Sequence, residues 1–224
     1  MQILLISATP FEVEPLFSYV SKQWKQENSC VFSKKNCRIE ILYTGVGSVA
    51  TTYNLHKKLL QNSYDLVIQA GVAGAFSSSI ALGSVWAIAS DCFADLGAED
   101  HDNLLSVFDL GLCKDNESPF TQKRIVNQHL DKFTLTIPRA TAITVQSASG
   151  SERSIAQRRK WEADLESMEG AAFHYVCQLE EQAYIQVRSV SNYIIPRDRS
   201  TWKMQEAIAS LNQFLIEFME TISL

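Results

Sequence analysis

The sequence predicts an α/β fold, with a central mixed but mostly parallel, twisted β-sheet that is flanked by helices on both faces. One observation behind this prediction is that short buried apolar runs alternate along the chain with longer amphipathic stretches of helical period. The other is composition, because 46% of the 224 residues are hydrophobic and 20% are charged, which suits a folded chain with a sizeable core. No internal repeat or linker-like segment interrupts the chain, so we expect a single domain over residues 1–224.

The first elements follow this alternation. Residues 2–7 form a short apolar run that predicts a strand, and an amphipathic helix is expected over 13–24. The patterns then predict a strand at 38–43, a helix at 48–60 and a third, buried strand at 65–70. Strands that alternate with helices in this way are typical of parallel sheets joined by crossover helices.

The next predicted element is a strand at 84–89. Residues 91–122 then carry many acids and no firm periodicity, and a loop of that length inside a compact domain is usually functional or disordered. The remaining elements are expected in this order: a strand at 142–145, helices at 152–161 and 168–179, a strand at 185–190 and a long closing helix at 202–222.

Composition also excludes several classes of protein. Twenty Lys and Arg against 25 Asp and Glu leave a net charge of −5, which gives no electrostatic support for nucleic-acid binding. The apolar runs are too short to span a bilayer, and segment 2–7 lacks the basic flank of a signal peptide. The five cysteines form no CxxC pair, and their odd number does not suggest a disulfide framework. We therefore expect a cytoplasmic protein that binds neither nucleic acid nor a membrane.

A glycine-rich turn at 45–50 follows one predicted strand and opens a helix, and it fits the dinucleotide fingerprint G-x-G-x-x-[G/A]. The acid that binds the ribose should end the second strand, whereas Asp65 precedes its strand. Two other interpretations stay open: a tight turn that allows close packing, or backbone amides that face an anion or a sugar. His101 lies in an acidic segment that is more typical of a solvated surface than of a metal site. We expect no cofactor and no metal.

Polar side chains gather where predicted strands end, which is where open α/β sheets bind ligands. Glu12 lies just beyond the first strand, and Glu169 opens a helix, where the helix dipole favours a carboxylate. Asn192 ends the strand that contains Arg188. Each acid alone is explained equally well as a helix-start charge, but together these residues converge on one rim of the sheet. That convergence predicts a small-molecule site.

Five segments in order resemble the purine nucleoside phosphorylase and nucleosidase superfamily: 1–12, which ends in Ala-Thr-Pro-Phe-Glu, then 44–47, 69–74, 167–171 and 188–192. The resemblance implies a nucleoside phosphorylase-like fold. It is strongest to the nucleosidase branch, whose mark is a glutamate in the first loop that Glu12 matches. No arginine occurs between Arg38 and Arg124 to serve a phosphate, which favours water as the nucleophile.

Segments 95–102 and 192–202 look like loops of the futalosine hydrolase family. The resemblance implies hydrolysis of futalosine to hypoxanthine and dehypoxanthine futalosine, a step of menaquinone biosynthesis. Asn192 supports a 6-oxopurine, because methylthioadenosine enzymes carry an aspartate there and an asparagine cannot supply its proton, although a flipped amide would soften this discrimination. The alternative is a methylthioadenosine/S-adenosylhomocysteine or aminodeoxyfutalosine nucleosidase that releases adenine. A phosphorylase and a catalytically silent nucleoside sensor are more distant alternatives.

The resemblance also implies roles for individual residues. Glu12 is expected to act as general base and Asn192 to stabilise the departing base. Glu169 is expected to accept hydrogen bonds from the ribose hydroxyls, Met168 to pack under the ribose and Arg188 to hold Glu169.

Further substrate contacts are expected from Gly71 and Ala73, and from Arg199 and Trp202, which suit a carboxyphenyl ketone at the 5′ position. Members of the superfamily are typically homodimers or larger. We therefore expect a second copy to cover part of the pocket through the loop at 91–111.

Overall fold

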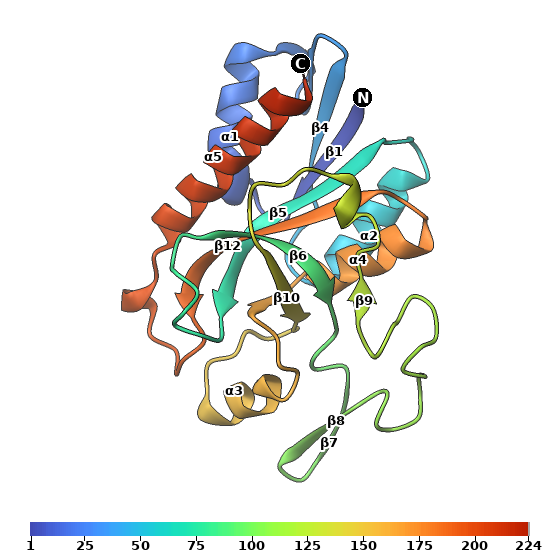
Figure 1. The fold of residues 1–224 in the computed structure, drawn as a ribbon, viewed down its shortest axis with the longest axis vertical. Coiled ribbons are helices and arrows are strands. Elements are labelled where there is room, and N and C mark those ends of the chain that lie inside the picture. The colour runs from blue at the N-terminus through green and yellow to red at the C-terminus, as the bar shows by residue number, and fades with distance from the viewer. Residues whose placement is uncertain (224) are drawn as a thin grey trace.

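The computed structural model describes residues 1–223, and a large mixed β-sheet runs through its centre (Figure 1). The strands are β1 (Gln2–Ser7), β2 (Lys25–Asn28), β3 (Val31–Lys34), β4 (Cys37–Tyr43), β5 (Leu66–Ala75), β6 (Val85–Asp91), β9 (Ile125–Val126), β10 (Arg139–Thr144), β11 (Leu165–Ser167) and β12 (Tyr184–Tyr193). Their order is β11-β10-β6-β12-β5-β1-β4-β3-β2, with β9 beside β6.

The described chain forms five helices: α1 (Pro10–Gln23), α2 (Ser48–Leu59), α3 (Glu152–Arg159), α4 (Gly170–Leu179) and α5 (Met204–Ile222). Four of them cover the sheet, whereas α3 lies beyond the ends of its strands (Figure 1). Helices α1 and α5 pack together on one face, and α2 and α4 pack together on the other (Figure 1). Along β1, Ile3 and Leu5 face the first helix pair, whereas Leu4 and Ile6 face the second. This double coverage explains why the four central residues of the strand, 3–6, are all apolar.

The prediction of a mixed α/β sheet with helices on both faces is confirmed, but the expected majority of parallel pairings is not found among the described residues. Within residues 1–223 the large sheet has as many antiparallel as parallel pairings. The link 76–84 between β5 and β6 is short and carries no crossover helix, so the chain turns back after β5. Strand β6 therefore runs antiparallel to β12, which is itself parallel to β5.

The sheet also closes on itself. Strand β5 pairs with β12, and β12 leads through β6 and β10 to β11, which returns to pair antiparallel with the end of β5. These five strands form a ring. Closure is possible because β5 is long: Leu66–Gln69 pair with β1, while Gly74 and Ala75 pair with β11. The sequence analysis ended this strand at residue 70, whereas the small residues 71–75 continue it.

The predicted helices and the longer predicted strands are present, with boundaries that differ by a few residues. The elements that were missed are short or polar, such as β2 and β11. The segment 91–122 is not a plain loop, because β7 (Gly97–Asp100) and β8 (Asn103–Ser106) form a hairpin within it.

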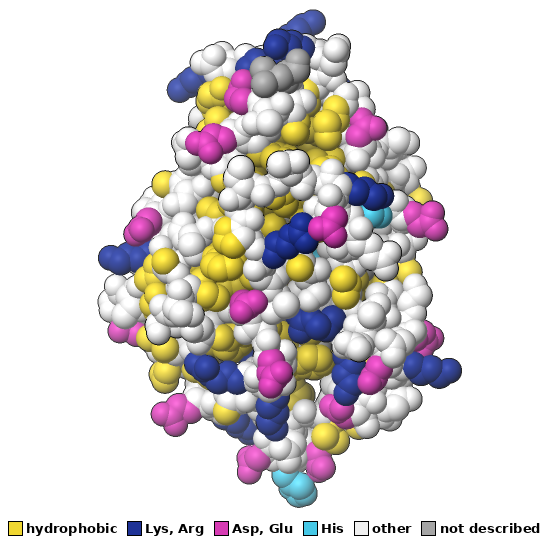
Figure 2. Space-filling model, in the orientation of Figure 1, with side chains coloured by type: hydrophobic (Ala, Val, Ile, Leu, Met, Phe, Trp, Pro, Cys, Tyr) yellow, Lys and Arg dark blue, Asp and Glu magenta, His cyan; other side chains and the backbone are white. Residues whose placement is uncertain are grey.

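Charges of both signs are mixed on the face of the molecule that Figure 2 shows, without a continuous basic area. In the described chain, no helix combines the length and the apolar character that crossing a bilayer requires.

Candidate active site

A cavity of about 290 Å³ opens at the carboxyl ends of β1, β5, β11 and β12, next to the first turns of α1 and α4. This is the rim of the sheet at which the sequence analysis placed the site. Six of the predicted residues line the cavity: Glu12, Ala73, Met168, Glu169, Asn192 and Trp202.

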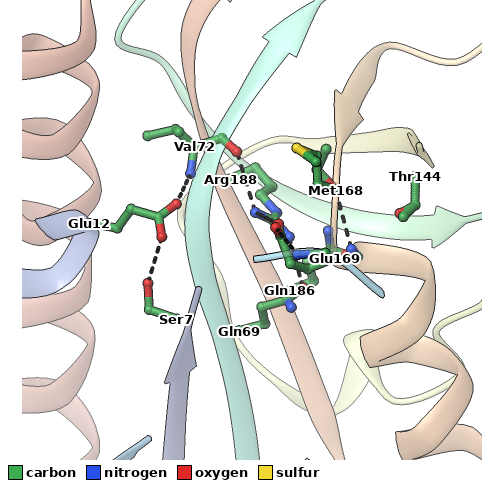
Figure 3. A network of polar contacts seen from close by, with 12 residues as sticks. Ser7, Glu12, Gln69, Val72, Thr144, Met168, Glu169, Gln186 and Arg188 are labelled. Carbon is green, nitrogen blue, oxygen red and sulfur yellow. Dashed lines mark hydrogen bonds and ion pairs between the residues drawn. The ribbon is translucent and has the colours of Figure 1, made fainter. Parts of the chain in front are cut away.

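Glu12 lies in the first turn of α1 and is 8% exposed. Thr9 is the N-cap of this helix, and the Thr9 amide donates to Glu12 Oε2 at 3.1 Å. Ser7 Oγ donates to the same oxygen at 3.0 Å, and the Val72 amide donates to Oε1 at 3.2 Å (Figure 3). Donors from β1, from the cap and from β5 therefore hold this carboxylate in one orientation at the cavity wall.

Directly after Glu12, helix α1 is kinked at Val13, whose φ of −126° is not helical. The side chain of Asn212, from α5, is inserted at this point. Its Oδ1 accepts from the Leu16 amide at 2.9 Å, and its Nδ2 donates to the Glu12 carbonyl oxygen at 2.8 Å. These two groups would bond to each other in a regular helix, so Asn212 replaces one helical hydrogen bond and sets the direction in which Glu12 leaves the helix.

Glu169 is the N-cap of α4 and is 6% exposed. The Gly47 amide donates to its Oε1 at 3.1 Å, and Arg188 Nη1 donates to its Oε2 at 3.3 Å. The Arg188 guanidinium also donates to Gln69 Oε1 at 3.0 Å and to the Val72 carbonyl at 3.3 Å (Figure 3). Arg188 is therefore a buried charge with a carboxylate partner, which is the condition under which burial is tolerated.

The glycine-rich turn at 45–50 thus points a backbone amide at a carboxylate. Of the interpretations considered for this turn, the observed one has its amides facing an anion, here supplied by Glu169. Gly47 has a φ of +89°, which a residue with a side chain rarely adopts, so the turn depends on glycine.

Gly71, which was expected to contact the substrate, and Arg188, which was expected to hold Glu169, do not line the cavity but lie behind it. A Cβ at Gly71 would fall 2.5 Å from Arg188 Nη1 and 2.9 Å from Glu12 Oε1. Gly71 is therefore the spacer that lets the groups holding both glutamates pass close to each other. Ala73, two residues on, does line the cavity.

Asn192 lies near the end of β12, where the register against β5 shifts after Val190. Such irregularities redirect side chains beside binding sites. Its Oδ1 accepts from Ser191 Oγ at 2.9 Å, and its Nδ2 donates to the Tyr193 carbonyl at 3.1 Å.

Trp202 forms part of the cavity wall, whereas Arg199 does not and is exposed. The guanidinium carbons of Arg197 and Arg199 lie 5.0 and 5.7 Å from the centre of the Trp202 ring. Arg199, which was expected to contact the 5′ group of the substrate, thus lies against the indole and outside the cavity lining.

Two further groups at this site were missed by the sequence analysis. Asp91 is fully buried below the start of α4, where Thr144 Oγ1 donates to it at 2.9 Å and accepts from the Ala171 amide at 2.7 Å. Burial raises the pKa of Asp91 to about 6. A Cβ at Gly170 would fall 2.1 Å from Asp91 Oδ2, so the helix packs on this carboxyl only because residue 170 is glycine.

The second is Glu166 on β11, which lines the cavity and is 6% exposed. The Ser149 amide and hydroxyl donate to its two oxygens at 2.7 and 2.5 Å, and Arg158 Nε lies 3.8 Å away. Burial raises the pKa of Glu166. Glu166 could have been identified from the sequence by its position two residues before Met168, at the end of a strand.

Comparison with known proteins places this architecture in a family. The sequence model of the phosphorylase superfamily matches residues 2–220. The chain belongs to this superfamily. The resemblance seen in the five sequence segments is thereby confirmed.

Two similar proteins of the superfamily are named futalosine hydrolase. The one from Streptomyces coelicolor is 31% identical over 149 residues, which cover 66% of this chain and 62% of that protein. The one from Thermus thermophilus is 28% identical over 179 residues, which cover 76% of each. The match thus spans less than two thirds of the Streptomyces protein.

Solved structures of the superfamily share the fold over nearly the whole chain. A 5′-methylthioadenosine/S-adenosylhomocysteine nucleosidase from Neisseria meningitidis aligns with a TM-score of 0.78 at 16% identity, covering 98% of this chain and 99% of that one. An S-adenosylhomocysteine nucleosidase from Streptococcus pyogenes aligns with a TM-score of 0.76 at 19% identity, covering 99% and 97%. At these identities the likeness establishes the superfamily fold.

Proposed function

We propose that this chain is a nucleosidase that hydrolyses the N-glycosidic bond of futalosine and releases hypoxanthine. The observation that carries the proposal is the pair of glutamates in one cavity, Glu12 and Glu169, each with its carboxylate held by fixed donors. The names of the two curated relatives support futalosine as the substrate.

Cleavage of an N-glycosidic bond places positive charge on the ribose and negative charge on the departing base, so the site must stabilise both. In the proposed mechanism, Glu12 accepts a proton from the attacking water. The water oxygen forms the new bond to C1′ of the ribose as the N-glycosidic bond to the base breaks. General base catalysis of this kind contributes about 10²–10⁴-fold.

The other cavity residues hold the two halves of the substrate. Glu169 accepts hydrogen bonds from the ribose 2′ and 3′ hydroxyls, and Met168 packs under the sugar. Asn192 stabilises the departing base at the far wall of the cavity. Trp202 offers an aromatic wall for the carboxyphenyl group at the 5′ position.

Arg188 acts on Glu169 and not on the substrate, because its three polar partners in the described chain are Glu169, Gln69 and the Val72 carbonyl. An arginine engaged in this way is not free to bind phosphate. This supports water over phosphate as the nucleophile.

A second candidate is a nucleosidase that releases adenine from methylthioadenosine, S-adenosylhomocysteine or aminodeoxyfutalosine. The observation in its favour is the Asn192 amide, which presents one donor and one acceptor and can serve a 6-amino group when turned over.

Base release followed by chromatography separates the candidates. The protein is supplied with futalosine, aminodeoxyfutalosine, methylthioadenosine or inosine, each with and without phosphate. We expect hypoxanthine from futalosine at a rate that phosphate does not change. Adenine from methylthioadenosine would establish the second candidate, and a requirement for phosphate would exclude both.

A further inference from the structure

Glu166 and Asn192 stand on the two sides of Gly74. In the closed ring, Gly74 of β5 is the register partner of Glu166 on β11 and of Asn192 on β12, and all three line the cavity. Neighbouring strands lie about 4.8 Å apart, so the two flanking backbones are separated by roughly 10 Å. A Cβ at Gly74 would fall 2.9 Å from Ile194 Cγ1 and 3.1 Å from Asn192 Nδ2, so glycine is what allows these two side chains to pack close to β5. Glu166 and Asn192 face the same cavity from the two sides of Gly74.

Asn192 by itself does not decide which purine enters. A 6-oxopurine presents an acceptor at position 6 and a donor, N1–H, beside it, whereas a 6-aminopurine presents a donor at position 6 and an acceptor at N1. Because an amide carries both a donor and an acceptor, Asn192 can satisfy position 6 of either base by turning over. Discrimination needs a second group that cannot adapt.

We propose that Glu166 is this group and selects the base, because its carboxylate accepts the N1–H of a 6-oxopurine and opposes the N1 lone pair of a 6-aminopurine. The inference rests on the proposed function, since it takes the cavity to be the nucleoside site. In its ionised form a carboxylate only accepts hydrogen bonds, so rotation does not make it suit adenine, and only protonation would supply a donor for N1.

The surroundings of Glu166 suit this role. Each of its oxygens accepts one bond from Ser149 and retains capacity for another. Arg158 lies between Glu166, 3.8 Å from its Nε, and Asp95, 3.3 Å from its Nη2, and Nε forms no hydrogen bond within the described chain. The carboxylate is therefore fixed and compensated but not saturated, and it is buried enough for an unmatched partner to be costly.

The first test compares futalosine with aminodeoxyfutalosine, which differ in the 6-oxo and 6-amino group, for the wild type and for Glu166→Gln. A glutamine keeps an acceptor for Ser149 and gains a donor for the N1 of adenine. We expect the ratio of the two kcat/KM values to fall by roughly 10- to 100-fold toward the 6-amino substrate, the range for one hydrogen bond to a charged group. Glu40→Gln is the matched control, because Glu40 is a carboxylate paired with Lys58 and Tyr64 outside the cavity lining. If Glu166 only braces the loop that holds Ser149, both substrates lose rate equally and the unchanged ratio overturns the proposal.

The second test needs neither turnover nor Glu166→Gln. Hypoxanthine, 1-methylhypoxanthine and adenine are titrated as free bases against the wild type and Glu166→Ala, with binding measured by calorimetry. The wild type should bind hypoxanthine at least tenfold more tightly than 1-methylhypoxanthine, which lacks N1–H, and the gap should narrow in Glu166→Ala. Equal binding of the two bases by the wild type overturns the proposal.

The failures of the two proposals are distinguishable. If hypoxanthine is released from futalosine but Glu166→Gln leaves the ratio of the two kcat/KM values unchanged, the role of Glu166 is excluded and futalosine hydrolysis stands. If the protein binds hypoxanthine more tightly than 1-methylhypoxanthine but releases no hypoxanthine from futalosine, the role of Glu166 is supported and the proposed reaction is excluded.

Discussion

At the scale of single residues, Glu12 has the most specific environment, since every donor that holds it belongs to a neighbouring strand or to its own helix cap. We expect Glu12→Gln to lower kcat by about 10²–10⁴-fold, because an amide cannot take a proton from water. Binding of the free base should be unchanged within a factor of a few. Glu14→Gln, two residues on and exposed, serves as the control and should keep full activity. Steady-state kinetics and calorimetry check both, and a fully active Glu12→Gln variant would exclude the mechanism.

A substitution at Gly71 tests whether the positions of Glu12 and Glu169 depend on the close packing of Arg188 and Glu12 against this glycine. In Gly71→Ala the new methyl group meets both Arg188 and Glu12 at distances that van der Waals contact does not allow. We expect activity to fall about 100-fold through misplacement of the two carboxylates, and stability to fall by about 1–3 kcal/mol. Gly111→Ala is the control for activity, because Gly111 is exposed and a Cβ there meets nothing within 4 Å, and its φ of +69° makes alanine cost only stability, by about 1 kcal/mol. Wild-type rates in Gly71→Ala would contradict the spacer role.

At the scale of elements, α5 supports Glu12 through one side-chain amide, that of Asn212. Removal of that amide in Asn212→Ala frees the Leu16 amide to bond directly to the Glu12 carbonyl and straighten α1. We expect kcat to fall roughly 10- to 100-fold with little change in KM, because Glu12 moves while the rest of the cavity stays. The neighbouring Gln213→Ala should be silent, since Gln213 is exposed. An equal loss in both variants would point to general destabilisation of α5.

The start of α4 predicts a dependence of stability on pH. Burial raises the pKa of Asp91 from 3.8 to about 6, so as pH falls the native state binds a proton at this carboxyl before the unfolded chain does. Ionisation of the buried carboxyl therefore lowers the free energy of unfolding as pH rises through 6. Asp91→Asn removes that cost, and the unpartnered Gln186 Oε1 can accept from the new amide. The free energy of unfolding of Asp91→Asn should exceed that of the wild type by about 3 kcal/mol more at pH 8 than at pH 4. Urea unfolding at both pH values measures this, and a gain that is the same at both would contradict it.

The burial of His174 acts in the opposite direction. It lowers the pKa of this imidazole to about 3, so the unfolded chain binds a proton below pH 6.5 that the native state refuses. Stability from His174 is present above pH 6.5 and is lost as pH falls toward 3. Without the opposing contribution of Asp91, Asp91→Asn should therefore lose stability more steeply than the wild type between pH 6 and 4.

At the scale of the whole molecule, large apolar side chains are exposed beside the cavity. Val49 and Tyr53 on α2 are 80% and 63% exposed, Leu112 is 75% exposed, and Val46 belongs to the cavity lining. We propose that a second copy of the chain covers this surface, as expected from the superfamily resemblance. Val49→Asp should then yield monomers in sedimentation velocity where the wild type forms dimers. A wild type that sediments as a monomer at micromolar concentration would exclude the proposal.

Much of the fold and the outline of the site could be predicted from local pattern. Buried strands such as β1 carry a continuous apolar run, here residues 3–6, because helices cover both faces, and the amphipathic helices show their period directly. Glu12, Glu169 and Asn192 were identified because residues at the ends of parallel strands share one rim. These features depend on short stretches of chain, so the sequence by itself determines them.

The tertiary structure alone decided how the sheet closes and what supports the site. The pairing of β11 with β5 joins Glu166 to Gly74, and the insertion of Asn212 into α1 joins residues 200 positions apart. Neither contact leaves a periodic or local signal, because each depends on where a distant segment arrives in space. The same holds for Gly71, whose need for glycine comes from Arg188 and Glu12 together. Local pattern determines what each segment becomes, whereas contacts across the folded chain determine which side chains meet.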